Sequence, residues 1–212
     1  MTNSSEKRLN PPATILLLGS FDPQTKPILA NAKEEIVKTF SGENVFALML
    51  DTLEIYTADD MEVLTELSAE KTITLFIFQN SQLIDMVDVK QKDQDADKTV
   101  YDYLKENYTI KKIDKLPIFN KLDILMRDAT AIFLLRHKEE TRGGEYLELM
   151  HALFRGHANK VWFLKRNGIA LSAMLMEYLD KYGVKMRIYS EEKDLNDALT
   201  RILKYQLQDS DF

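Results

Sequence analysis

Cysteine is absent from the 212-residue sequence, which excludes disulfide bonds, thiolate metal ligands and a cysteine nucleophile. Histidine is scarce, and the spacing of His137, His151 and His157 matches no zinc site. We therefore expect no metal ion and no other cofactor. No apolar run approaches the roughly 20 residues that span a bilayer, and no apolar segment follows a basic start. These absences predict a cytoplasmic protein without membrane contact.

Charge of one sign is nowhere concentrated. The 28 Lys and Arg and the 34 Asp and Glu residues alternate along the chain and leave a net charge of -6. A polyanion is a poor partner for such a surface, so we expect no general nucleic-acid binding. Apolar residues make up 45% of the chain, which at this length is enough to form a sizeable core.

The apolar pattern predicts one α/β domain. Residues 1–12 are polar and contain two prolines, so we expect a disordered N-terminal segment there. A single domain is expected over 13–208. Strands and helices alternate over most of this range, which favours a mainly parallel sheet of flavodoxin or Rossmann-like type with helices on both faces. Strands are predicted at 15–18, 45–50, 73–78, 129–135, 161–164 and 184–189, and helices at 27–40, 61–67, 118–126, 145–154, 170–182 and 194–207.

Two further segments are less regular. Residues 72–78 and 83–89 have the spacing of paired strands, so a hairpin interrupts the alternation there. A charged connector at 91–98 leads into an amphipathic stretch that contains Val100 and Leu104. The apolar residues of 170–179 suit either the core or a face for homo-oligomer formation, and both readings stay open.

The first candidate site follows the first predicted strand. In a parallel sheet, ligands bind beyond the carboxyl ends of the strands, where Gly19, Ser20, Phe21 and Asp22 lie. Gly19 allows a ligand to approach the backbone, while Ser20 and Asp22 offer polar groups. The alternative is a simple turn, because Gly-Ser and Asp-Pro are common turn formers.

The second candidate site follows the strand predicted to end at Leu135. Arg136, His137 and Arg142 are basic, and Gly143 and Gly144 at a helix start can present backbone N–H groups to an anion. This combination predicts a mildly cationic site that prefers a phosphorylated ligand, and a flexible turn is the alternative. Because both candidate segments follow parallel strands, we expect them to meet at one edge of the sheet.

At this second place the chain resembles a known superfamily. Residues 127–135 (RDATAIFLL), 144–152 (GEYLELMHA) and 160–164 (KVWFL) are similar to the nucleoside 2-deoxyribosyltransferase and nucleotide N-glycosidase group, in which a strand leads through a Gly-containing loop to a helix-borne glutamate. Gly19-Ser20 is similar to that group's nucleotide loop. A Glu-Leu pair here also resembles TIR-type domains, some of which cleave NAD.

The resemblance implies a nucleotide or nucleoside as the small-molecule ligand and a role for Glu148 at the anomeric carbon, as nucleophile or charge stabiliser. It also implies phosphate or ribose contacts for Ser20 and Gly144. Independently of the resemblance, a carboxylate beside the anomeric carbon lowers the barrier to cleaving an N-glycosidic bond, because positive charge develops on the sugar.

Two observations favour a non-catalytic alternative. The transferases commonly carry an acidic residue just past the fourth strand, where this chain has Arg136 and His137, with Glu139 and Glu140 as the alternative carboxylates. On a helical wheel, Leu147 and Phe154 belong to the apolar face and Glu148 falls nearly opposite it, which favours solvent, although its place in the first turn also allows it to point into the crevice. A nucleotide-sensing or protein-interaction module of the same fold is therefore the second hypothesis.

Overall fold

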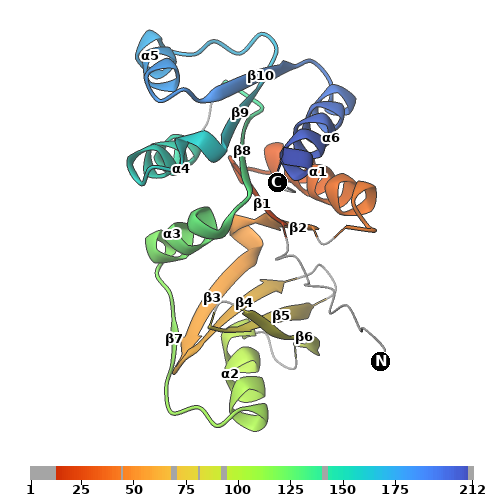
Figure 1. The fold of residues 1–212 in the computed structure, drawn as a ribbon, viewed down its shortest axis with the longest axis vertical. Coiled ribbons are helices and arrows are strands. Elements are labelled where there is room, and N and C mark those ends of the chain that lie inside the picture. The colour runs from red at the N-terminus through yellow and green to blue at the C-terminus, as the bar shows by residue number, and fades with distance from the viewer. Residues whose placement is uncertain are drawn as a thin grey trace, which may run out of the picture. The chain divides into compact units, whose positions relative to one another are not determined.

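The computed structural model describes residues 13–43, 45–67, 71–80, 82–91, 95–139 and 143–209. The chain divides into two compact units, which we call the parallel unit (Met1–Met49 with Met126–Phe212) and the antiparallel unit (Leu50–Leu125). Each contains one five-stranded sheet (Figure 1). The predicted α/β class is thus confirmed, but the predicted mainly parallel sheet describes only the first unit. The single domain over 13–208 stays a prediction, and the N-terminal segment at 1–12 lies outside the described residues.

The sheet of the parallel unit has the strand order β10-β9-β8-β1-β2, and all neighbouring pairs are parallel. Its strands are β1 (Ala13–Gly19), β2 (Val45–Met49), β8 (Ala131–Arg136), β9 (Val161–Arg166) and β10 (Lys185–Tyr189). Counted along this unit, the strands lie in a flavodoxin-like order, and the winding direction reverses between β1 and β8. Such a reversal opens a crevice at the carboxyl ends of the two strands, where ligands bind in this type of sheet.

Helices cover both faces of the parallel sheet (Figure 1). The helices are α1 (Thr25–Thr39) and α6 (Glu192–Asp209) on one face and α4 (Gly144–Phe154) and α5 (Ala173–Lys181) on the other. Ile15 and Leu17 of β1 pack into one cluster with Leu29 of α1 and Leu199 of α6. The intervening Leu16 is fully buried on the opposite face, as expected for a central strand covered on both sides. Short 3-10 turns occur at Leu50–Thr52 and Ala158–Lys160.

The antiparallel unit has the strand order β6-β5-β4-β3-β7. Its elements are β3 (Leu53–Ala58), β4 (Met61–Leu67), β5 (Thr72–Gln79), β6 (Gln82–Lys90), α2 (Ala96–Asn107) and β7 (Ile113–Lys115). Helix α3 (Ile118–Asp128) follows β7 and contains the boundary between the two units. Val100 and Leu104 of α2 pack on one face of this sheet.

The predicted hairpin is confirmed by β5 and β6, whereas the helix predicted at 61–67 is wrong. Buried Met61, Val63 and Thr65 alternate with more exposed neighbours, which is the period of a strand. The spacing of apolar side chains in residues 61–67 is also compatible with a helix. The segment is a strand because it pairs with β3 and β5. Strands β3 and β7 were not predicted.

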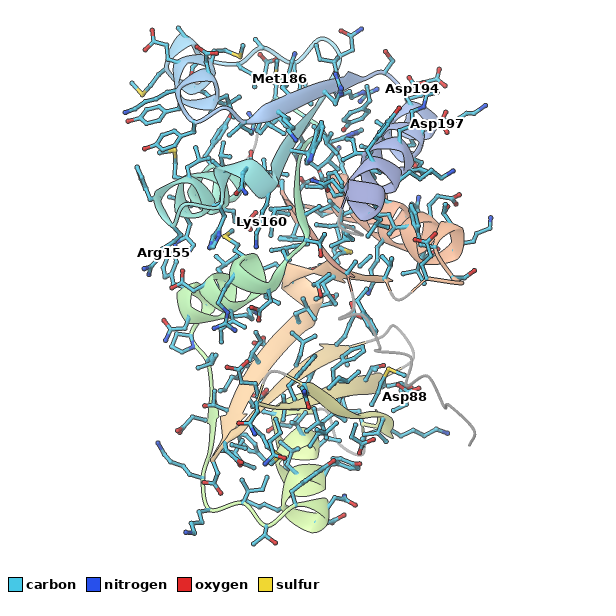
Figure 2. All side chains as sticks on the ribbon, in the orientation of Figure 1. Asp88, Arg155, Lys160, Met186, Asp194 and Asp197 are labelled. Carbon is cyan, nitrogen blue, oxygen red and sulfur yellow. The ribbon has the colours of Figure 1, made fainter. Side chains whose placement is uncertain are left out.

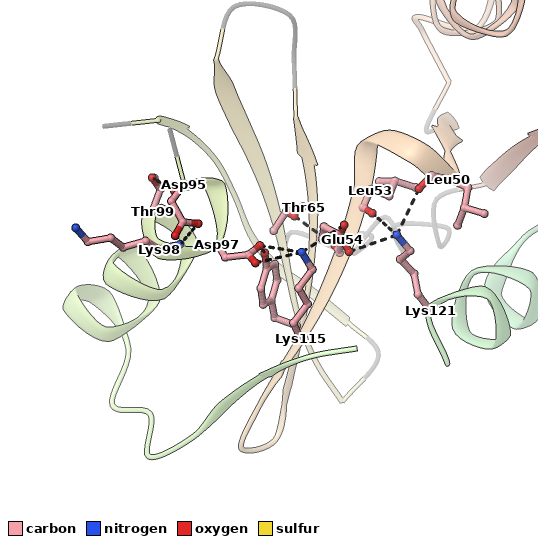
Figure 3. A network of polar contacts seen from close by, with 11 residues as sticks. Leu50, Leu53, Glu54, Thr65, Asp95, Asp97, Lys98, Thr99, Lys115 and Lys121 are labelled. Atoms are coloured by element: carbon pink, nitrogen blue, oxygen red, sulfur yellow. Dashed lines mark hydrogen bonds and ion pairs between the residues drawn. The ribbon is translucent and has the colours of Figure 1, made fainter. Parts of the chain in front are cut away.

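A polar network ties α2 to the antiparallel sheet (Figure 3). The Tyr56 hydroxyl donates to Asp97 at 2.5 Å, and the Lys115 ammonium lies 2.9 Å from the same carboxylate. Close by, buried Lys121 donates to the Leu53 carbonyl at 2.6 Å and pairs with Glu54 at 3.3 Å. Burial of the Tyr56 ring and the neighbouring Asp97 charge raise the pKa of the Tyr56 hydroxyl far above its usual range.

Within the described residues, no helix has both the length and the apolar character needed to cross a bilayer.

Candidate functional site

The end of β1 requires glycine at position 19. Gly19 pairs with Leu135 of β8, and its φ of +153° is rarely adopted by residues with a side chain. A Cβ atom at this position would lie 2.8 Å from the Leu135 carbonyl oxygen. The glycine therefore allows the backbones of β1 and β8 to approach closely where the winding direction reverses.

Asp22 organises the loop that follows β1. Its Oδ1 accepts hydrogen bonds from the backbone N–H groups of Gln24 at 2.9 Å and Thr25 at 3.3 Å, and it pairs with Lys138 at 2.8 Å. Burial alone would raise the pKa of Asp22, but the bonds from Lys138 and the Ser20 hydroxyl, together with those backbone bonds, hold it far below the usual range. Asp22 therefore joins the first candidate segment to the second, and its role in ligand binding stays a prediction.

The loop before α4 ends in Gly143, whose φ of +80° places it in the left-handed region, and the helix begins at Gly144. The buried face of α4 comprises Glu145, Glu148, Leu149, Ala152 and Leu153. Leu147 and Phe154, which the helical wheel assigned to the core, are 66% and 67% exposed. The prediction that Glu148 faces solvent is therefore wrong. The carboxyl groups of Glu145 and Glu148 lie on the buried side of α4 near its amino-terminal end. A helical wheel that uses apolar residues alone therefore predicted the wrong buried face.

Glu148 is the central residue of the site. Its side chain is 9% exposed and accepts a hydrogen bond from the Gly19 backbone N–H. Its Oε2 atom is buried and has no hydrogen-bond partner among the described residues. Burial, reinforced by the nearby Glu145 charge and only partly opposed by the Gly19 bond, raises the pKa of Glu148 to about 8. At neutral pH the carboxyl group therefore holds its proton.

The contact between Glu148 and Gly19 confirms that the two candidate segments converge at the carboxyl edge of the sheet.

Arg136 and Glu145 form a buried ion pair beside Glu148. Their side chains are 6% and 1% exposed, and Arg136 Nη1 donates to Glu145 Oε1. Arg136 Nη2 also donates to the Glu139 carbonyl, and the guanidinium lies 4.7 Å from the centre of the Tyr146 ring. These contacts neutralise the charge of Arg136 and orient α4, so Arg136 acts here as a positioning residue. Its predicted contact with a ligand remains untested.

His137 lies at the same edge, between β8 and β10. Its Nδ1 is 2.9 Å from the Tyr189 hydroxyl, and its Nε2 is 3.5 Å from the Arg166 guanidinium. Burial first, and the Arg166 charge second, lower the pKa of His137, although Glu192 and Asp22 oppose the shift. His137 is therefore neutral at pH 7. Of the residues expected to make the site cationic, Arg142 lies outside the described residues, while Arg166 contributes a positive charge beside His137 that was not predicted.

Sequence reasoning placed Gly19, Ser20, Phe21, Asp22 and Glu148 at one edge of the sheet, where the structure has them. It missed Glu145, Lys138 and Tyr189. Lys138 directly follows the predicted pair Arg136-His137, and Tyr189 ends an apolar strand run, so the rule used for Gly19 also covers both. Within the described part of the chain, no group of three or more His, Asp or Glu side chains could hold a metal ion.

Comparisons with known proteins add little. No family model and no curated protein matches the chain. The metal-soaked Flv1 flavodiiron core from Synechocystis sp. PCC6803 is structurally similar with a TM-score of 0.40 and 9% sequence identity. The match covers 93% of this chain and 38% of the flavodiiron chain.

Proposed function

We propose that the protein binds a nucleotide or nucleoside at the carboxyl edge of the parallel sheet and hydrolyses its N-glycosidic bond through Glu148. The observation that supports this most directly is the burial of Glu148 against the Gly19 backbone N–H with a pKa of about 8. A buried carboxyl group without an ion-pair partner costs free energy, and such groups are concentrated where chemistry needs them.

The raised pKa suits a sequence of two roles. The protonated Glu148 donates its proton to the ring nitrogen of the departing base as the bond between that nitrogen and the anomeric carbon breaks. The carboxylate that remains then lies beside the positively charged anomeric carbon and stabilises it or bonds to it. Water adds its hydroxide to this carbon and returns a proton to Glu148, so the products are free base and free sugar or sugar phosphate.

Glu145 supports this chemistry without touching the reacting atoms. It pairs with Arg136, and its charge helps to raise the pKa of Glu148, which has no such partner. The Gly19 N–H contributes a fixed dipole directed at Glu148, which favours the carboxylate once the proton has left.

The experiment is to incubate the purified protein with a panel of nucleosides, nucleoside monophosphates and NAD, and to measure free base by liquid chromatography. We expect base release from at least one substrate, and its loss in Glu148→Gln. The matched control is Glu177→Gln, because Glu177 is exposed on α5 and lies outside the site. Release that persists in Glu148→Gln, or no release from the whole panel by the native protein, contradicts the proposal.

The second candidate function is nucleotide sensing without turnover. The observation that favours it is the use of Arg136 and His137 in internal contacts, where the transferases have an acidic residue. A protonated Glu148 would then donate a hydrogen bond to the ligand. Thermal stabilisation by a nucleotide without base release supports sensing. The absence of any stabilisation would leave the third possibility, a protein-interaction module.

A further inference from the structure

A groove lies between the edge strand β10 and the helix α6 of the parallel unit, and we call it the β10–α6 groove. Its volume is about 830 Å³, which is within the range of small-molecule sites. None of its lining residues belongs to the site around Glu148. They are Trp162, Lys185, Arg187, Asp194, Asp197, Ala198, Arg201, Ile202, Tyr205 and Gln206.

The backbone pattern explains why these side chains meet. Lys185 and Arg187 alternate along β10 and lie on the sheet face covered by α6, together with Trp162, the register partner of Lys185. On α6, lining residues recur every three to four positions, which brings them to one side of the helix. Asp194 and Asp197 lie in the first turns of α6 (Figure 2), while Arg201 and Tyr205 lie further along it.

Three cations and two aspartates line the groove, and none of the three cations pairs with a carboxylate of the described residues. Lys185 Nζ and Arg187 Cζ lie 4.7 and 5.8 Å from the centre of the Trp162 ring. Among the described residues, neither these two nor Arg201 forms an ion pair with a carboxylate. In a protein of net charge -6, three such cations around one hollow favour an anionic ligand.

Two buried polar atoms at the groove also lack partners. Trp162 Nε1 and Gln206 Oε1 are shielded from solvent and make no hydrogen bond to any described residue. An indole N–H is a donor only, so it needs an acceptor such as a phosphate oxygen. Leaving a buried donor unsatisfied is unfavourable, and an oxyanion removes that penalty once the side chains that cover the Trp162 N–H move aside, whereas the Gln206 oxygen needs a donor instead.

We propose that the β10–α6 groove binds a small ligand with two or more linked phosphate groups. Lys185, Arg187, Arg201 and the Trp162 N–H supply donors, and arginine favours phosphate in particular. The exposed Tyr205 ring, 72% accessible, offers a surface on which a base can stack. Asp194 and Asp197, which line the groove at the amino-terminal part of α6, repel a long, continuous polyanion, so the groove suits a nucleoside polyphosphate or inorganic polyphosphate better than a nucleic-acid strand.

Trp162 is the only tryptophan of the chain, so its fluorescence reports on this groove alone. Titration with tripolyphosphate and, separately, with ATP should change the emission as the phosphates draw Lys185 and Arg187 away from the ring. Tighter binding of ATP than of tripolyphosphate identifies the nucleoside form, and equal binding identifies the phosphates alone. Both outcomes support the groove as a polyphosphate site.

The test variant is Arg201→Gln, because Arg201 lines the groove without lying over the Trp162 ring. We expect it to weaken binding by about tenfold or more, while Lys204→Gln, on the same helix but outside the lining, has little effect. Glu148→Gln should leave the titration unchanged, which separates this inference from the proposed function. No change in emission with either ligand, equal losses in the Arg201 and Lys204 variants, or tighter binding of an oligothymidylate strand than of tripolyphosphate would overturn the proposal.

Discussion

The backbone N–H of Gly19 donates a hydrogen bond to the carboxyl group of Glu148, which joins the end of β1 to the first turns of α4. This contact connects residues far apart in sequence at the point where the sheet reverses its winding direction. It depends on the close approach of β1 and β8, and the absence of a side chain at Gly19 permits that approach.

Replacing Gly19 with alanine should therefore destabilise the protein. The new Cβ would lie 2.8 Å from the Leu135 carbonyl oxygen, and alanine disfavours a φ of +153°. We expect a loss of about 2 kcal/mol in the free energy of unfolding, measured by urea denaturation. Gly42→Ala is the matched control, because a Cβ at Gly42 meets no atom within 4 Å. Equal effects of the two substitutions would show that Gly19 has no special conformational role.

Glu148 should make the stability of the protein depend on pH. The native-state pKa is about 8, against 4.5 for an ordinary glutamate. Between these values the native state holds a proton that the unfolded state has lost, so the free energy of unfolding falls as the pH rises, by roughly 1 kcal/mol per pH unit. The Glu148→Gln variant lacks this titration. It should match the native protein near about pH 5 and exceed its stability near about pH 8.

Chemical denaturation of both proteins across this pH interval measures the difference. Parallel curves for the two proteins would mean that Glu148 titrates normally, and the proton donation proposed for it would then lose its basis.

Removing one partner of the buried ion pair Arg136–Glu145 should lower the free energy of unfolding more than replacing both partners with apolar residues. Arg136→Met leaves the Glu145 charge buried without compensation, for an expected loss of about 3 kcal/mol or more. Combining it with Glu145→Leu removes that charge as well and should recover most of the lost stability. A double-mutant cycle by denaturation measures the coupling. Additive losses would show that the pair does not act as a unit.

Much of the parallel unit could be predicted from sequence because its strands are continuous apolar runs and its helices repeat at a clear period. The antiparallel unit was harder. In β4, Met61, Val63 and Thr65 alternate with Glu62 and Glu66, yet the segment is short enough to fit a helix as well. Its strand form depends on pairing with β3 and β5, which local sequence does not encode.

The position of the candidate site could be predicted from the sequence, but the burial and the pKa of Glu148 could not. The rule that ligands bind at the carboxyl ends of parallel strands identified the Gly19 loop and the segment after Leu135, while Glu148 was identified by the family resemblance. The helical wheel failed for Glu148 because a buried ion pair, Arg136 with Glu145, brings polar groups onto the inner face of α4. Such a pair depends on residues brought together only by the fold, so neither the burial nor the raised pKa of Glu148 could be inferred from spacing.

His137 should titrate below the usual range of histidine, because burial and the Arg166 charge both disfavour its protonated form. The hydrogen bond to Tyr189 and the 3.5 Å approach of Arg166 Nη1 to Nε2 hold the His137 ring beside the ends of β9 and β10.

Nuclear magnetic resonance titration of the ring protons measures the pKa of His137 directly. In Arg166→Gln the pKa of His137 should rise toward the value of a free histidine, because a nearby positive charge has been removed while burial remains. If the pKa of His137 stays constant in Arg166→Gln, burial alone sets it. A histidine that is already protonated in the native protein at pH 7 would instead restore a cation to the site and strengthen the case for a phosphorylated ligand there.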